Sequence, residues 1–138
     1  MSKKFVHREG KKIINHRGET FRLRGVGIGG WLLMEGYMLH SYGDIDRPRR
    51  FQDHFIKTAG KAYTKRFLEQ WIRLFFTEDD IKLIKSSGFN SIRIAIDYQC
   101  LYKASDDQVE LTKIDDHFDI LDETIKRCKK HHIYVLLD

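Results

Sequence analysis

The 138-residue sequence predicts an α/β fold with a parallel sheet, and three observations support this. Residues 89–96 and 133–138 are apolar runs of strand length. Stretches with helical periodicity precede both of them, and a hairpin-like pattern opens the chain. Because strands alternate with helices, we expect the strands to be parallel and the crossovers right-handed.

Composition is that of an ordinary globular domain with one core: 41% of residues are hydrophobic and 33% are charged. The net charge of +5 comes from scattered clusters rather than from basic and aromatic residues interleaved on one element, so no nucleic-acid partner is expected. No stretch approaches the roughly 20 apolar residues of a membrane span, so no membrane partner is expected either. The first ten residues lack the apolar run of a secretory leader, which leaves the cytoplasm as the default location.

The first expected element is a short β-hairpin within residues 10–24. Lys11–Asn15 and Thr20–Arg24 flank a turn in which Gly18 can adopt positive φ. The first strand of the sheet is expected over about residues 21–27, and an ordered, irregular loop is expected to follow it as far as Gly43.

Two helices are expected between residues 51 and 75, separated at Gly60. Their aromatic residues fall on a four-residue spacing that is more typical of a core than of a ligand site: Phe51, Phe55, Tyr63, Phe67, Trp71 and Phe75. Thr77 is expected to cap a further helix that opens with acidic residues and ends before Gly88.

The strand over residues 89–96 places isoleucines on one face and Arg93, with Ser91 and Ala95, on the other. A helix from about Ile114 to Lys130 follows, with an apolar stripe that includes Cys128 and so buries its thiol. The last strand is a continuous apolar run, as expected for a strand covered on both faces.

Residues 25–30, GVGIGG, satisfy the dinucleotide-binding pattern G-x-G-x-x-G. A phosphate cradle needs a buried strand before the glycines, a helix that opens at the third one, and an acid at the end of the next strand. Here residues 21–24 alternate with charge, residues 31–36 contain no cap, and Asp44 and Asp46 lie in a loop. Dinucleotide binding is therefore the least favoured function. No cofactor is expected, and the spacing of the histidines predicts no metal site.

Three stretches taken in order resemble the opening third of glycoside hydrolase family 5, the cellulase and exo-glucanase type of (β/α)₈ barrel. They are FRLRGVGIGGWLLMEGYM, TEDDIKLIKSSGFNSIRIAIDY and LDETIKRCKKHHIYVLLD. The resemblance covers about residues 10–138. It implies that residues 1–138 form an incomplete TIM-barrel glycoside hydrolase domain, with the hairpin at about 10–24 and barrel strands at about 21–27, 89–96 and 133–138.

The resemblance assigns roles to several residues. Arg93 matches the family's second-strand arginine, which supports the nucleophile carboxylate. A cation there would hold a carboxylate ionised and could contact it through two parallel hydrogen bonds. A solvated or structurally paired arginine is the alternative. Glu35 matches the glutamate with which exo-glucanase-like members hydrogen-bond the sugar. An acid in an apolar stretch is costly without a partner or water, which agrees with that role. A surface acid in a loop is the alternative.

Asp97 and Tyr98 follow the second strand, at the end where barrel active sites lie. Tyr98 resembles a family aromatic near the sugar-binding cleft, and Asp138 matches the family's third-strand aspartate. Trp31 is a further candidate that could stack on a sugar ring, although packing in the core is the favoured interpretation.

The resemblance implies a retaining β-glycoside hydrolase that acts on β-glucan or a related saccharide. Retaining hydrolysis needs two carboxylates about 5–5.5 Å apart. In this family both are glutamates at the ends of strands four and seven. Neither is expected within these residues, so this chain alone is expected to be an inactive N-terminal fragment that could associate through exposed barrel edges. A small α/β sugar-binding module without catalysis is the main alternative. The sugar, the linkage and endo or exo action depend on other loops.

Overall fold

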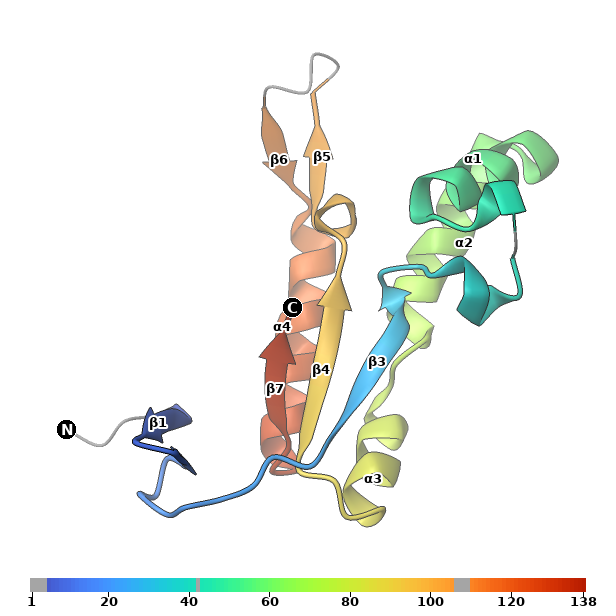
Figure 1. The fold of residues 1–138 in the computed structure, drawn as a ribbon. Coiled ribbons are helices and arrows are strands. Elements are labelled where there is room, and N and C mark those ends of the chain that lie inside the picture. The colour runs from blue at the N-terminus through green and yellow to red at the C-terminus, as the bar shows by residue number, and fades with distance from the viewer. Residues whose placement is uncertain (1–4, 42, 106–109) are drawn as a thin grey trace.

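A parallel sheet of three strands forms the centre of the molecule (Figure 1). The computed structural model describes residues 5–41, 43–105 and 110–138. β4 (Ser91–Ile96) lies between β3 (Gly25–Leu32) and β7 (Tyr134–Leu137), and both pairings are parallel. The carboxyl ends of all three strands therefore lie along one edge of the sheet, which we call the carboxyl edge.

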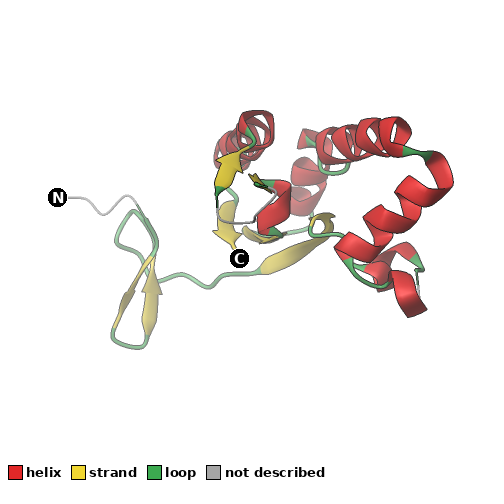
Figure 2. Ribbon diagram, turned by 90° about the horizontal axis from the view of Figure 1, so that it is seen from above, coloured by secondary structure: helices red, strands yellow, loops and turns green. Residues whose placement is uncertain are grey.

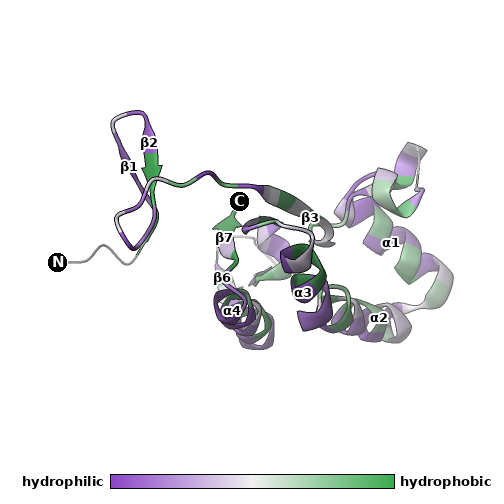
Figure 3. Ribbon diagram, turned by 90° about the horizontal axis from the view of Figure 1, so that it is seen from below, coloured by the Kyte–Doolittle hydropathy of each residue, from purple (hydrophilic) through white to green (hydrophobic). Residues whose placement is uncertain are grey.

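Three helices cover one face of this sheet (Figure 2). They are α2 (Lys61–Leu74), α3 (Glu78–Ser86) and α4 (Asp115–Lys130). Each carries hydrophobic and hydrophilic residues (Figure 3), and the core forms where their apolar sides meet β3 and β4. Its buried members include Trp31, Leu32, Ile72, Phe76, Ile81, Ile92, Ile94, Leu121, Cys128 and Ile133.

The predicted boundaries of α3 and α4 agree with the structure to within one or two residues. The backbone N–H of Thr77 donates to the carboxylate of Asp80 at 2.7 Å, as expected for a capped helix start. Cys128 is fully buried on α4, and burial raises the pKa of its thiol to about 11. The long periodic segments thus form the elements that their patterns predict.

The glycine-rich stretch differs from its prediction beyond residue 27, because residues 28–32 continue the strand where a loop was expected. β3 runs on to Leu32 with an irregularity, since Ile28 pairs with Ile94 but Leu32 already pairs with Ile96. Gly30 adopts φ +74° within this bulge, a conformation that glycine takes without strain. The bulge turns two consecutive side chains, Trp31 and Leu32, into the core.

Residues 21–24 form no regular strand, so the first strand begins at Gly25 rather than at residue 21. Asn90 holds this segment against the start of β4. Its side-chain amide donates to the carbonyl of Arg22 at 2.8 Å and accepts from the N–H of Arg24 at 2.7 Å. These side-chain bonds occupy backbone groups that a strand partner would otherwise use.

The expected hairpin is also displaced along the chain. β1 (His7–Glu9) pairs with β2 (Lys12–Ile14), and only a single bridge, from Ile14 to Thr20, joins the arms of the predicted 10–24 hairpin. The turn predicted around Gly18 is nevertheless present: Gly18 has φ +82°, and the side-chain oxygen of Asn15 accepts from the backbone N–H groups of Arg17 and Glu19.

α1 (Pro48–Ala59) and α2 meet at Gly60, which adopts φ +83°. Rings pack in sequence between the two helices, with centroid separations of 5.5, 4.8, 5.7 and 4.7 Å along Phe51, Phe55, Phe67, Trp71 and Phe75. Tyr63 does not take part and is 54% exposed. The other five rings pack on one another, but none of them belongs to the buried core, so the core role predicted for this stripe is met only in part.

A second hairpin was not predicted. β5 (Tyr102–Ala104) and β6 (Leu111–Lys113) are antiparallel and extend beyond the carboxyl edge, after the short 3-10 helix η3 (Tyr98–Cys100) (Figure 1). Three-residue strands are too short to show a period. Within the described ranges, no helix combines the length and apolar character needed to cross a bilayer.

Candidate functional site

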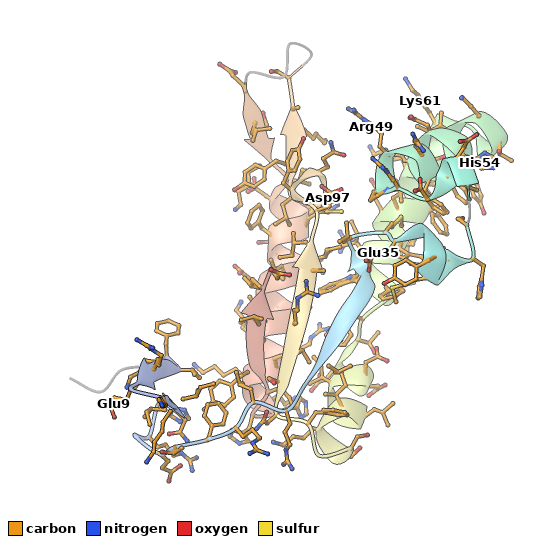
Figure 4. The ribbon with its side chains drawn as sticks, viewed as in Figure 1. Glu9, Glu35, Arg49, His54, Lys61 and Asp97 are labelled. Atoms are coloured by element: carbon orange, nitrogen blue, oxygen red, sulfur yellow. The ribbon has the colours of Figure 1, made fainter. Side chains whose placement is uncertain are left out.

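Polar side chains gather at the carboxyl edge of the sheet. Glu35 follows β3, Asp97 follows β4 and Asp138 follows β7. Figure 4 shows Glu35 and Asp97 close to the ends of their strands. Because the three strands are parallel, these carboxylates from distant parts of the sequence lie along one edge of the sheet.

Arg93 lies on the sheet face that the helices leave open. Its neighbours Ile92 and Ile94 are buried, whereas Arg93 is exposed, as the alternation predicted. Its guanidinium donates a hydrogen bond to the Asp138 carboxylate, and both side chains are about half exposed, at 54% and 53%.

The Arg93–Asp138 contact joins two residues that the family resemblance had singled out. A guanidinium has five N–H donors, and one of them contacts Asp138. Arg93 can therefore hold a second acceptor on the same face. That Arg93 supports a nucleophile carboxylate stays a prediction. The alternative, an arginine with a structural ion-pair partner, also agrees with the structure, because Asp138 is such a partner.

Glu35 lies over the glycine-rich strand. A Cβ built on Gly29 would lie 3.1 Å from its Oε2 and 2.7 Å from the Met38 sulfur, so the missing side chain leaves room for both residues. The Tyr37 hydroxyl donates to Glu35 Oε1 at 3.4 Å, and Tyr37 is 64% exposed. Sequence reasoning missed Tyr37, although its position two residues after a candidate acid could have indicated it.

The location of Gly25, Gly27 and Gly30 tests the G-x-G-x-x-G pattern. The glycines lie inside β3, and the element that follows is a four-residue 3-10 helix, Gly36–Leu39. A dinucleotide cradle needs the glycines after the strand and an α-helix that begins at them. The dinucleotide hypothesis is therefore wrong.

Asp97 has a clear local task. Its Oδ1 accepts from the N–H of Gln99 at 3.0 Å and so caps η3, while its own N–H donates to the carbonyl of Leu32 at 2.9 Å. Tyr98 is 55% exposed, and its hydroxyl accepts from the side chain of Gln99 at 3.2 Å. Asp97 thereby presents Tyr98 at the carboxyl edge.

Trp31 is not part of this surface, and its candidate role in binding is wrong. It is 1% exposed, its indole N–H donates to the carbonyl of Ile72 at 2.8 Å, and its ring lies 5.5 Å from that of Phe76. No face of the indole is left for a sugar ring, so the favoured interpretation of core packing is correct.

A hollow of about 270 Å³ continues the site between α1 and the segment after β4. Its lining combines aromatic and planar polar side chains: Arg49, Gln52, Asp53, Ile56, Tyr98, Gln99, Tyr102 and Ala104. Over the described ranges, no group of three or more His, Cys, Asp or Glu side chains has the arrangement of a metal site.

The opposite edge of the sheet is covered by side chains from the N-terminal segment. The ring of Phe21 lies 4.9 Å from that of Tyr134 at the start of β7, and His16 Nδ1 lies 3.0 Å from the Tyr134 hydroxyl. The β1–β2 hairpin lies near these amino ends (Figure 1). Glu35, Asp97 and Asp138 thus lie at the carboxyl edge, while the N-terminal segment contacts the start of β7 at the other edge.

Comparison with known proteins agrees with this arrangement. The chain is 32% identical over 129 residues to a beta-xylosidase of Phanerodontia chrysosporium, which covers 94% of this chain and 26% of that protein. It is also 32% identical over 145 residues to glucan 1,3-beta-glucosidase I/II of Saccharomyces cerevisiae, which covers 97% of this chain and 32% of that protein. The chain therefore spans about a third or less of the length of these curated relatives.

The crystal structure of rutinosidase from Aspergillus niger matches with a TM-score of 0.65 at 21% identity, over 86% of this chain and 33% of that chain. This likeness supports the predicted fold class, the first part of a (β/α)₈ barrel with three parallel strands. The family described as cellulase (glycosyl hydrolase family 5) matches residues 56–138. The chain belongs to glycosyl hydrolase family 5.

Proposed function

We propose that this chain supplies the sugar-holding part of a retaining β-glycoside hydrolase that acts on β-1,3-glucan oligosaccharides. The observation that carries the proposal is the Arg93–Asp138 pair on the open face of the sheet, at the same edge as Glu35. The names of several relatives, glucan 1,3-beta-glucosidases, support the choice of sugar and linkage.

In this proposal each residue has a distinct task. The carboxylate of Glu35 accepts hydrogen bonds from sugar hydroxyls. The guanidinium of Arg93 keeps a neighbouring nucleophile carboxylate ionised and oriented. The two carboxylates that perform retaining hydrolysis come from later strands of a complete barrel, so the 138 residues alone are expected to bind saccharide without cleaving it.

The test is to express the complete reading frame that encodes these residues and to measure initial rates on laminaribiose, an aryl β-glucoside and an aryl β-xyloside. Both glucosides should be hydrolysed faster than the xyloside. Arg93→Ala should lower kcat/KM by about 100-fold, the usual loss for one preorganised electrostatic contact. Arg93→Lys should recover only part of it, because lysine lacks the planar fork.

Arg73→Ala is the matched control. Arg73 is an exposed arginine whose partner, Asp116 at 3.7 Å, lies on the helical side of the molecule. Its replacement should leave the rates unchanged. Equal effects of the two substitutions would refute the role of Arg93, and binding of laminaribiose without hydrolysis would favour the sugar-binding module.

A further inference from the structure

The position of Glu35 depends on a residue that has no side chain of its own. We propose that Gly29 is a positioning residue for Glu35: because it lacks a Cβ, the Glu35 carboxylate and the Met38 thioether can lie directly against β3. A side chain at position 29 would move the carboxylate away from the sugar that it holds. This inference rests on the proposed function, which gives Glu35 the contact with the sugar.

Gly29 lies on the same face of the sheet as Arg93. In the register between β3 and β4, Gly27 lies beside Arg93, which is on the face that the helices leave open. Successive residues of a strand point to opposite faces, so Gly29, two residues after Gly27, is directed to the open face as well. A side chain on Gly29 would therefore enter the side of the sheet on which Arg93 and Glu35 act.

Two other residues already fill the space beside Gly29. A Cβ added there would lie 2.7 Å from the Met38 sulfur, 3.1 Å from the Met38 methyl carbon and 3.1 Å from Oε2 of Glu35. Carbon atoms pack at about 3.5–4.0 Å, so both side chains would have to move. Gly29 does not have a positive φ, so this conflict is one of space and not of backbone conformation.

The loop that carries Glu35 cannot retreat as a unit, because its backbone is held at the next residue. The N–H of Gly36 donates to the carbonyl of Asp46 at 3.0 Å, and a Cβ on Gly36 would lie only 2.6 Å from the Asp46 backbone. The N–H of Met38 donates to the carbonyl of Glu35 at 3.0 Å, which closes the turn. A Cβ on Gly29 must therefore displace the side chains of Glu35 and Met38.

Packing, more than hydrogen bonding, determines where the Glu35 carboxylate lies. The Tyr37 hydroxyl donates to Oε1 at 3.4 Å, which is longer than the usual 2.5–3.0 Å of a bond between two oxygens and therefore weak. Oε2 lies against β3 at Gly29, beside the Met38 thioether. A carboxylate that is held before the sugar arrives loses less side-chain entropy on binding, which increases affinity.

The test is a double-mutant cycle in the protein from the complete reading frame, with kcat/KM for laminaribiose as the readout. Glu35→Ala should lower kcat/KM about 100-fold and Gly29→Ala about tenfold, the range expected for losing or misplacing a hydrogen bond to a charged group. When Glu35→Ala is already present, Gly29→Ala should change kcat/KM less than twofold. A positioning residue has no further effect once the group that it positions is absent.

Gly27→Ala is the matched control, because it adds the same methyl group to the same face of β3 with no atom within 4 Å. It should leave kcat/KM unchanged. Adding Met38→Ala to Gly29→Ala removes the sulfur closest to the new Cβ and should recover part of the lost activity. Circular dichroism monitors folding, and if Gly29→Ala alone does not fold, the Gly29→Ala/Met38→Ala protein replaces it in the cycle.

The outcomes separate this inference from the proposed function. A wild-type kcat/KM for Gly29→Ala, or an equal loss with and without Glu35→Ala, would overturn the positioning role and leave the proposed function in place. If the unsubstituted protein does not hydrolyse laminaribiose, or if Glu35→Ala has the wild-type kcat/KM, the proposed function itself fails.

Discussion

Replacing Trp31 with phenylalanine tests the core of the molecule and its separation from the site. The substitution removes an indole N–H that donates to the carbonyl of Ile72 at 2.8 Å in a side chain that is 1% exposed. Leaving a buried acceptor without this donor costs about 1–3 kcal/mol. The smaller ring adds about 1 kcal/mol for the incompletely filled space. We therefore expect the free energy of unfolding to fall by about 2–4 kcal/mol.

Trp71→Phe is the matched control. The indole of Trp71 makes the same type of hydrogen bond, to the carbonyl of Gly30 at 2.9 Å, but it is only partly buried. Water can replace this donor, so the expected loss is about 1 kcal/mol. Urea unfolding followed by circular dichroism measures both without depending on indole fluorescence. A loss for Trp31→Phe no larger than that for Trp71→Phe would refute the assigned core position.

Two further predictions concern pH and the bulge in β3. Hydrogen bonds from Lys130 and His131 lower the pKa of Glu78 from 4.5 to about 2. Because the folded pKa is the lower one, this stabilisation is present above about pH 4.5 and is lost as the pH falls toward 2. Glu78→Gln should therefore reduce the difference in urea midpoint between pH 7 and pH 3, and an unchanged difference would contradict the assignment. At Gly30, φ +74° makes Gly30→Ala cost about 1–2 kcal/mol. Gly27→Ala, with no atom within 4 Å of the added Cβ, should change the unfolding free energy by less than this, and thermal unfolding decides whether the order holds.

The elements that the sequence predicted well are those whose period is long enough to be seen. α4 and β4 each repeat one pattern over their full length, so their faces could be assigned residue by residue. The bulge in β3 could not be predicted, because the burial of Trp31 beside Leu32 depends on Ile72, which is 41 residues from Trp31 in the chain. The β1–β2 hairpin was missed for a different reason, since its strands of three residues are too short to show a period.

The sequence predicted on which face of its strand a candidate site residue lies, but not which residue it contacts. Alternation along β4 placed Arg93 opposite the isoleucines, and the structure agrees. The contact with Asp138 also requires the register between β4 and β7, in which Arg93 lies beside Leu136. The hollow beside α1 was missed altogether, because Arg49 and Tyr98 meet only through the tertiary arrangement.

The aromatic packing of α1 has a consequence for how the two ends of the site move. α1 contains no buried residue, whereas four of the six residues of β4 are buried. Local opening follows the number of buried apolar contacts. The amides of α1 are therefore expected to exchange with solvent deuterium faster, through local opening, whereas those of β4 should exchange only on global unfolding. The α1 side of the hollow is thus less stable locally than β4, which lies before Tyr98 in the chain. The distance between α1 and Tyr98 can therefore change without strain in the sheet.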